Sequence, residues 1–197
     1  MLAAAILAAG ESRRMGSPKA LISIRGQTFL ERLWVSTRHP RIGFTRIILG
    51  AGAADIRQKL PVGPATIVIN PDWRQGQLSS IRAAIRSLPD GATEGLLLCP
   101  VDHPLISTAL VASLIERFDS AGKQIVLPVF RGRRGHPVIF HAALYQELLG
   151  ASDSVGARQV VWAHPQEIIE VTTEEEGVVL NLDNPEVLRK ASQSEKS

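Results

Sequence analysis

Residues 7–19, with the sequence LAAGESRRMGSPK, combine two glycines with three basic side chains near the start of the chain. Gly10 and Gly16 allow the backbone to approach a ligand closely and to adopt φ values that other residues resist. A loop of this kind can direct several N–H groups at one anion, and Arg14 and Lys19 add the positive charge that a triphosphate needs. We therefore interpret the segment as a phosphate-binding loop; an ordinary turn with surface cations is the simpler alternative.

Asp102 is a second candidate for chemistry, because it ends a continuous apolar run at residues 95–101. Such a run is typical of a strand that is covered on both faces. Mg²⁺ prefers oxygen ligands and is held by one or two carboxylates together with substrate phosphates. The residues alone leave two interpretations of Asp102 open, a magnesium ligand and a turn or helix-capping aspartate.

Apolar strands that alternate with helices must position these groups. The pattern predicts strands at residues 2–7, 46–49, 66–69, 95–101, 124–130, 167–171 and 178–182. Helices are expected between them, including residues 142–149 and 155–161, one that begins at the Thr28-x-x-Glu31 capping box, one capped by Ser107 and one that begins at Pro185. This alternation implies an α/β fold, a single Rossmann-like, three-layer domain with a mostly parallel, mixed sheet. We assign residues 1–190 to the domain and residues 191–197 to a polar tail.

The predicted topology also indicates where a ligand binds. In open α/β sheets, ligands lie beyond the carboxyl ends of the strands. The loops after Leu7, Ile69 and Val101 should therefore lie on one rim. These loops carry the unusual residues, so topology and composition indicate the same place.

The composition argues against several classes of protein. A length of 197 residues suits one α/β domain, and a net charge of +3 without a long basic stripe argues against a nucleic-acid partner. The single cysteine, Cys99, cannot form an intrachain disulfide, as is usual in a reducing compartment. The apolar run at residues 2–7 is far shorter than the roughly 20 residues of a membrane span. We expect a cytoplasmic protein that binds neither nucleic acid nor a membrane.

The loop at residues 7–19 has neither the Walker spacing nor G-x-G-x-x-G. Read as LAAGxSxRMGxxK, it resembles the signature of the GT-A-like nucleotidyltransferases, the family that includes molybdenum cofactor cytidylyltransferase and guanylyltransferase and the sugar-phosphate nucleotidyltransferases. In that family the loop surrounds the base and the triphosphate. The resemblance therefore implies nucleotide-binding roles for Leu7, Ala8, Ala9, Gly10, Arg14 and Lys19.

The segment NPDWRQGQLSS, at residues 70–80, resembles the NPxWxxGxxSS segment of the same family. Its serines would begin a helix, and the free N–H groups of a helix N-terminus favour an anion. Trp73 could stack on a ring or simply pack. The resemblance implies further nucleotide-binding roles for Asn70, Gly76, Ser79 and Ser80.

The resemblance also implies a bound Mg²⁺ ion. The PVDHP context of Asp102 is similar to that of the family's metal-binding aspartate, and NLDNPE at residues 181–186 resembles the family's DxDTPEDL segment. Asp102 and Asp183 would be the metal ligands. Asn181 stands where an acid is common, and the start of the last helix is the alternative explanation of Asp183.

Two later segments resemble the molybdenum cofactor cytidylyltransferase branch, RGHP at residues 134–137 and GAR at residues 156–158. They imply acceptor-binding roles for Arg134, Gly135, His136 and Arg158. An arginine fork suits phosphate. For His136, a structural hydrogen bond to the backbone is the alternative role.

Together the resemblances imply an enzyme that transfers a nucleoside monophosphate from a nucleoside triphosphate to a phosphate acceptor and releases pyrophosphate. Lys19, Arg14 and Asp102 would be its catalytic residues and Mg²⁺ its cofactor. The LAAG sequence favours the cytidylyl branch, with CTP as donor and molybdopterin as acceptor, and would make a molybdoenzyme or its chaperone a further partner. The alternatives are a guanylyltransferase, a sugar- or polyol-phosphate nucleotidyltransferase, and a non-catalytic nucleotide-binding module.

Overall fold

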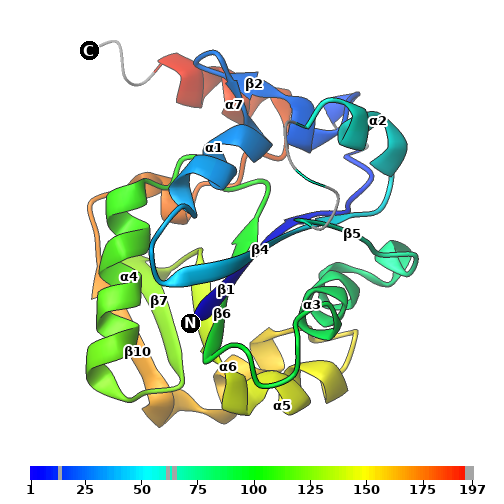
Figure 1. Cartoon of the computed structure of the whole chain (residues 1–197). Helices are drawn as coiled ribbons and strands as arrows, with labels where there is room; N and C mark the ends of the chain where they lie inside the picture. The colour runs from blue at the N-terminus through cyan, green and yellow to red at the C-terminus, as the bar shows by residue number, and fades with distance from the viewer. Residues whose placement is uncertain (13–14, 61–62, 64–65, 194–197) are drawn as a thin grey trace.

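An eight-stranded sheet runs through the centre of the molecule, which a computed structural model describes at residues 1–12, 15–60, 63 and 66–193 (Figure 1). In chain order its strands are β1 (Leu2–Ala8), β4 (Ile42–Leu49), β5 (Ile67–Ile69), β6 (Gly95–Pro100), β7 (Ile125–Phe130), β8 (Arg133–Arg134), β9 (Val138–His141) and β10 (Ile168–Thr172). Their order across the sheet is β10-β7-β9-β6-β1-β4-β5, and β8 pairs with β7. Strand β1 is parallel to β4 and β6, whereas β9 is antiparallel to β6 and β7. The predicted mostly parallel, mixed sheet is confirmed.

Helices cover both faces of this sheet (Figure 1). Residues of α1 (Phe29–Ser36), α2 (Ala53–Gln58), α4 (Thr108–Ala121) and α7 (Pro185–Gln193) pack in one core cluster. Residues of α3 (Gln77–Arg86), α5 (Tyr145–Gly150) and α6 (Arg158–Ala163) pack in the other. The three-layer arrangement is therefore as predicted. None of the helices in the described residues is long and apolar enough to cross a lipid bilayer.

Strand β1 shows how the sequence builds both layers. All seven of its residues are apolar and buried. The even-numbered residues belong to the core cluster that includes α1 and α4, and the odd-numbered residues from Ala3 to Leu7 belong to the cluster that includes α3 and α5. Successive side chains of a strand point to opposite faces, so one short segment supports two layers. Burial of a side chain such as Ile6 contributes about 1.5–3 kcal/mol.

Three of the predicted helix starts are confirmed. The Thr28 side chain accepts a hydrogen bond from the Glu31 amide at the start of α1, and the Glu31 carboxylate accepts one from the Thr28 amide. This capping box follows the small antiparallel pair of β2 (Ser23–Ile24) and β3 (Gln27–Thr28). The Ser107 hydroxyl accepts from the Leu110 amide at the start of α4, and α7 begins at Pro185.

The strand predicted at residues 178–182 is wrong. A 3-10 turn, Glu176–Val178, ends at the first of these residues, and residues 179–182 join no strand of the sheet. Val178 and Leu182 are fully buried, which explains the strand-like apolar pattern. Their backbone groups bond to loops instead: the Val178 carbonyl accepts from the His136 amide, and the Leu182 amide donates to the Asp102 carbonyl, both at 2.8 Å.

Other boundaries are shifted as well, and strand β4 begins at Ile42 rather than at the predicted residue 46. The helix expected at residues 142–149 divides into a 3-10 turn, Ala142–Leu144, and α5. Helix α6 begins at Arg158 rather than at residue 155, because Gly156 has a φ of +75° that interrupts a helix. Helix α7 continues to Gln193, and residues 194–197 of the predicted tail lie outside the described residues.

Candidate active site

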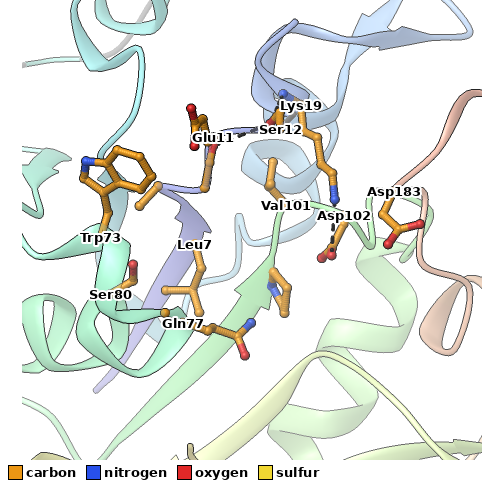
Figure 2. Close-up of a pocket in the computed structure, with 14 residues that line it drawn as sticks. Leu7, Glu11, Ser12, Lys19, Trp73, Gln77, Ser80, Val101, Asp102 and Asp183 are labelled. Atoms are coloured by element: carbon orange, nitrogen blue, oxygen red, sulfur yellow. Dashed lines mark hydrogen bonds and ion pairs between the residues drawn. The ribbon is translucent and has the colours of Figure 1, made fainter. Parts of the chain in front are cut away.

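The loops after β1, β5 and β6 meet at one edge of the sheet, as the topology predicted, and line a pocket of about 400 Å³. Figure 2 shows Lys19, Trp73, Asp102 and Asp183 around it, brought together from separate parts of the chain. We call it the strand-end pocket. Its described lining residues are Leu7, Ala9, Gly10, Glu11, Ser12, Lys19, Trp73, Gly76, Gln77, Ser80, Pro100, Val101, Asp102 and Asp183.

The loop after β1 is closed by Ser12. Ser12 has a φ of +57°, unusual for a residue other than glycine. Its hydroxyl accepts a hydrogen bond from the Lys19 amide at 2.9 Å, which ties the two ends of the loop together. The space beside Gly10 is open, since a Cβ there would meet no atom within 4 Å. The loop therefore holds its backbone at the pocket without filling it. Arg14 lies outside the described residues.

Lys19 and Asp102 lie opposite each other in the strand-end pocket. The distance from Lys19 Nζ to Asp102 Oδ2 is 3.6 Å, and the two side chains are 15% and 23% exposed. Asn181 Nδ2 donates to the same Asp102 oxygen at 2.8 Å. The backbone bond between Leu182 and Asp102 fixes this segment beside β6, so that Asp183 lines the same pocket.

The donor set of this pocket suits a hard cation. Asp102 and Asp183 offer carboxylate oxygens, and within the described residues there is no group of three or more His, Cys, Asp or Glu side chains that could hold a metal. A site with two carboxylates and room for phosphates fits a hard divalent cation that retains several waters better than metals that need four protein ligands. Asn181 acts here as a hydrogen-bond donor to Asp102.

Asn70 and Ser79 are not among the residues that line the strand-end pocket. Asn70 is buried, and its Nδ2 donates to Ser79 Oγ at 2.8 Å and to Ser80 Oγ at 3.1 Å. Its Oδ1 accepts from the Asp72 amide at 3.0 Å. These bonds connect the end of β5 to the first turn of α3. Of the three, only Ser80 lines the pocket.

Trp73 packs against the protein and also lines the pocket. Gly50 lies directly beneath it, and a Cβ at Gly50 would come within 2.6 Å of Trp73 Cβ. The Arg74 guanidinium lies over the indole, 4.4 Å from the ring centroid. One side of the ring is thus supported by the protein, while the residue contributes to the pocket wall.

A second pocket of about 400 Å³ adjoins the first and shares Leu7, Gln77 and Pro100 with it. We call it the side pocket. Its apolar part, which we call its floor, is lined by buried side chains of β1, α3, β6, β7 and β9. All four predicted acceptor-binding residues line it: Arg134, Gly135, His136 and Arg158.

His136 is held in its neutral form. Burial, the nearby His103 ring and the charge of Arg158 lower the pKa of His136 to about 4, although Asp102 acts in the opposite direction. The His103 and His136 rings are 5.0 Å apart between centroids. The backbone amide of His136 donates to Val178, whereas its Nδ1 has no hydrogen-bond partner among the described residues. The structural hydrogen bond thus involves the His136 backbone and not this ring atom.

Gly135 is required by close packing. A Cβ at this position would collide with the carbonyl of Val178. The next residue back, Arg134, forms an exposed ion pair in which its Nε lies 2.7 Å from Glu170 Oε1. Val178 thus packs against Gly135 and His136, and Glu170 of β10 pairs with Arg134 at the start of the segment.

Residues 4–168 match the family model described as the MobA-like NTP transferase domain. The chain belongs to this family. It is therefore a nucleotidyltransferase with a GT-A-like fold. This MobA-like domain carries the strand-end pocket beyond the carboxyl ends of its own parallel strands β1 and β6.

The proteins that resemble this MobA-like domain are named as different enzymes. The chain is 27% identical over 185 residues to molybdenum cofactor cytidylyltransferase of Escherichia coli (strain K12), covering 92% of this chain and 90% of that protein. It is 32% identical over 167 residues, 78% of each protein, to nicotine blue oxidoreductase of Paenarthrobacter nicotinovorans. Among solved structures, Rv0371c of Mycobacterium tuberculosis H37Rv superposes with a TM-score of 0.86 at 22% identity and covers 98% of this chain and 100% of that one. A Rv0371C complex with manganese has a TM-score of 0.74 at 24% identity and 98% coverage of both chains.

Several residues of the MobA-like domain were not singled out from the sequence. Ser12 and Gln77 line the strand-end pocket and lie within the motifs at residues 7–19 and 70–80. Their positions in these motifs could have identified them, whereas their residue types could not. His103 follows Asp102 directly, yet nothing in its spacing indicated that its ring lies against His136. Ala8, assigned to the nucleotide, is buried in the core, and its neighbour Ala9 lines the pocket.

Proposed function

We propose that this MobA-like domain transfers CMP from CTP to the phosphate of molybdopterin and releases pyrophosphate. The observation that carries the proposal is the pair of adjoining pockets. The strand-end pocket joins a glycine loop, a lysine and two carboxylates, and the side pocket contains the RGHP segment and Arg158. The similarity to the Escherichia coli cytidylyltransferase over 92% of the chain supports this assignment.

In the proposed reaction an acceptor phosphate oxygen forms a bond to the α-phosphorus of the donor. The bond from that phosphorus to the oxygen shared with the β-phosphate breaks, and its electron pair leaves with pyrophosphate. Such a transfer depends on alignment and on neutralisation of charge, so it needs no protein nucleophile. Lys19 and the N-terminus of α3, both at the strand-end pocket, would stabilise the leaving phosphates, together with Arg14.

The cofactor we propose is Mg²⁺, held by Asp102 and Asp183. When bound, the ion would neutralise charge on the phosphates. Asn181, through its 2.8 Å bond to Asp102 Oδ2, would orient that carboxylate. The proposal also includes the cytoplasm as the location and a molybdoenzyme or its chaperone as a partner.

The preference for CTP rests on Ala9. The guanylyl branch more often reads LAGG, so Ala9 stands where that branch has glycine. Ala9 lines the strand-end pocket, where one methyl group can restrict the space for a base. This supports a pyrimidine over the larger purine.

Pyrophosphate release with each of the four nucleoside triphosphates, with and without molybdenum cofactor, tests the proposal. We expect release with CTP and cofactor together, and little with GTP. Ala9→Gly should increase the use of GTP relative to CTP. No release with any donor in the presence of the cofactor would overturn the proposed acceptor.

The similarity to nicotine blue oxidoreductase supports a second candidate, a redox reaction in the same cleft. The same preparation can be assayed for oxidation of NADH and NADPH in the presence of a flat organic dye. Oxidation of either, together with the absence of pyrophosphate release, would favour the redox function.

A further inference from the structure

The floor of the side pocket is apolar. It is formed by inward-facing residues of four strands and by two residues of α3, all of them buried: Leu7, Leu78, Ile81, Leu98, Leu127, Val138 and Phe140. Hydroxyl groups placed against such a floor would lose water without gaining hydrogen-bond partners. The floor therefore favours a ligand with a large flat or apolar part.

Helix α6 contributes three side chains to the wall of this pocket. Arg158, Val161 and Trp162 occupy positions i, i+3 and i+4, which lie on one face of a helix, and all three line the pocket. The opposite side of α6 is anchored by the buried Val160. A cation and an aromatic ring thus belong to one face of α6, and both line the pocket.

Trp162 is 66% exposed, and Val155, in the turn before α6, is 38% exposed. A tryptophan side chain can bury roughly 150–250 Å² in a contact, so this ring offers a large unused apolar surface at the mouth of the pocket. Trp73, by comparison, is supported from beneath by Gly50.

We propose that Trp162 is a specificity-determining residue that stacks on a flat ring of the acceptor, while Arg158 meets the anionic group of the same molecule. This inference rests on the proposed function, because it takes the side pocket as the acceptor site. It adds a residue outside the RGHP and GAR segments. It also predicts which acceptors bind more tightly, because a flat ring gains a stacking contact with Trp162 and a polyol phosphate gains none.

Calorimetric titration with two probes tests the inference, pterin-6-carboxylate as a flat anion and glycerol 3-phosphate as a non-planar one. We expect Trp162→Ala to weaken pterin-6-carboxylate binding roughly tenfold, as for the loss of one stacked ring. Trp162→Phe should stay within about threefold of the wild type, because it retains an aromatic face. The matched control is Val35→Ala, an exposed apolar residue on α1 outside both pockets.

Glycerol 3-phosphate should bind all four proteins equally, whatever its affinity. Failure of the wild type to bind pterin-6-carboxylate, or equal binding by the wild type and Trp162→Ala, would overturn the inference. Trp162 would then be assigned to another contact. Pyrophosphate release by the wild type is measured separately, so the stacking role can fail while the proposed function stands, and the reverse.

Discussion

At the scale of single residues, the strand-end pocket depends on a small set of charges. Lys19 and Asp102 lie on different loops, and Asn181 reaches Asp102 from 79 positions further along the chain. The Lys19 charge is fixed locally by Pro18 and the Ser12 hydroxyl, whereas the Asp102 charge is positioned by the buried strand β6 that precedes it. Each can therefore be removed without disturbing the element that holds the other.

Lys19→Ala should lower kcat far more than it lowers stability. Loss of one well-placed charge donor costs roughly 10²–10³ in rate, whereas a partly exposed ion pair contributes about 1 kcal/mol or less. Steady-state pyrophosphate release and urea unfolding measure the two effects. Lys59→Ala, in an exposed lysine outside the strand-end pocket, is the control. Near-normal turnover of folded Lys19→Ala would remove the loop from the mechanism.

Asp102→Asn should remove most of the thermal stabilisation that Mg²⁺ and CTP give, while the protein remains folded. The change keeps the shape and loses the charge that a cation needs, and the lost attraction to Lys19 is partly screened by solvent. Thermal melts with and without Mg²⁺ and CTP measure this stabilisation, since a ligand bound to the folded state raises the melting temperature. Asp90→Asn, in an exposed turn, is the control. An unchanged Mg²⁺–CTP shift with unchanged turnover would make Asp102 a turn residue only.

At the scale of elements, α3 connects the two pockets. Its first turn lines the strand-end pocket, and Arg82, one turn further, holds the loop before α6. Arg82 Nε donates to the Leu149 carbonyl at 3.0 Å, Nη2 to the Ala151 carbonyl at 2.6 Å, and Nη1 to Asp153 Oδ1 at 2.6 Å. Residues 153–158 of that loop and helix line the side pocket. One guanidinium thus sets the position of a pocket wall that it does not itself line.

Arg82→Lys should raise the KM for the acceptor, by about tenfold if the loop loses its position, with little change in the KM for CTP. A lysine retains the charge but cannot reproduce three directed bonds. Initial rates at varied concentrations of each substrate separate the two constants. Arg86→Lys, exposed on the same helix, is the matched control. A rise in both constants, or in neither, would contradict the assignment of Arg82 to the acceptor side.

At the scale of the whole molecule, the buried His103–His136 pair links stability to pH. Burial lowers the pKa of both side chains, that of His136 to about 4. An unfolded histidine titrates near 6.5, so between about pH 4 and 6.5 the unfolded chain binds more protons than the folded one. Stability from this source is present above about pH 6.5 and is lost as the pH falls towards 4.

His136→Gln should therefore make the stability of the fold less sensitive to acid. One group of this kind contributes a slope of up to about 1.4 kcal/mol per pH unit. Urea unfolding at pH 7, 6, 5 and 4.5 measures the free energy of unfolding for each protein. His39→Gln, away from both pockets, is the control. Equal slopes for the wild type and His136→Gln would show that His136 does not titrate on unfolding in this range.

Much of the fold is encoded locally. The apolar run of β1 predicted a strand covered on both faces, Thr28 and Glu31 predicted the start of α1, and Pro185 predicted the start of α7. Because the carboxyl ends of parallel strands meet at one edge, this pattern also predicted which loops form the strand-end pocket. These predictions succeeded because each depends on neighbours within a few residues or on a rule of chain topology.

Tertiary structure alone decided the rest. No local pattern places β9 antiparallel between β6 and β7, yet that insertion brings His136 against His103. The apolar residues around Val178 predicted a strand because apolar periodicity indicates burial and does not indicate which backbone groups are hydrogen-bonded. The Val178 carbonyl is bonded to the loop that carries His136 and not to a strand. The three bonds of Arg82 join positions 67 to 71 residues apart in the sequence. Such contacts depend on how layers pack, which residue spacing along one element cannot specify.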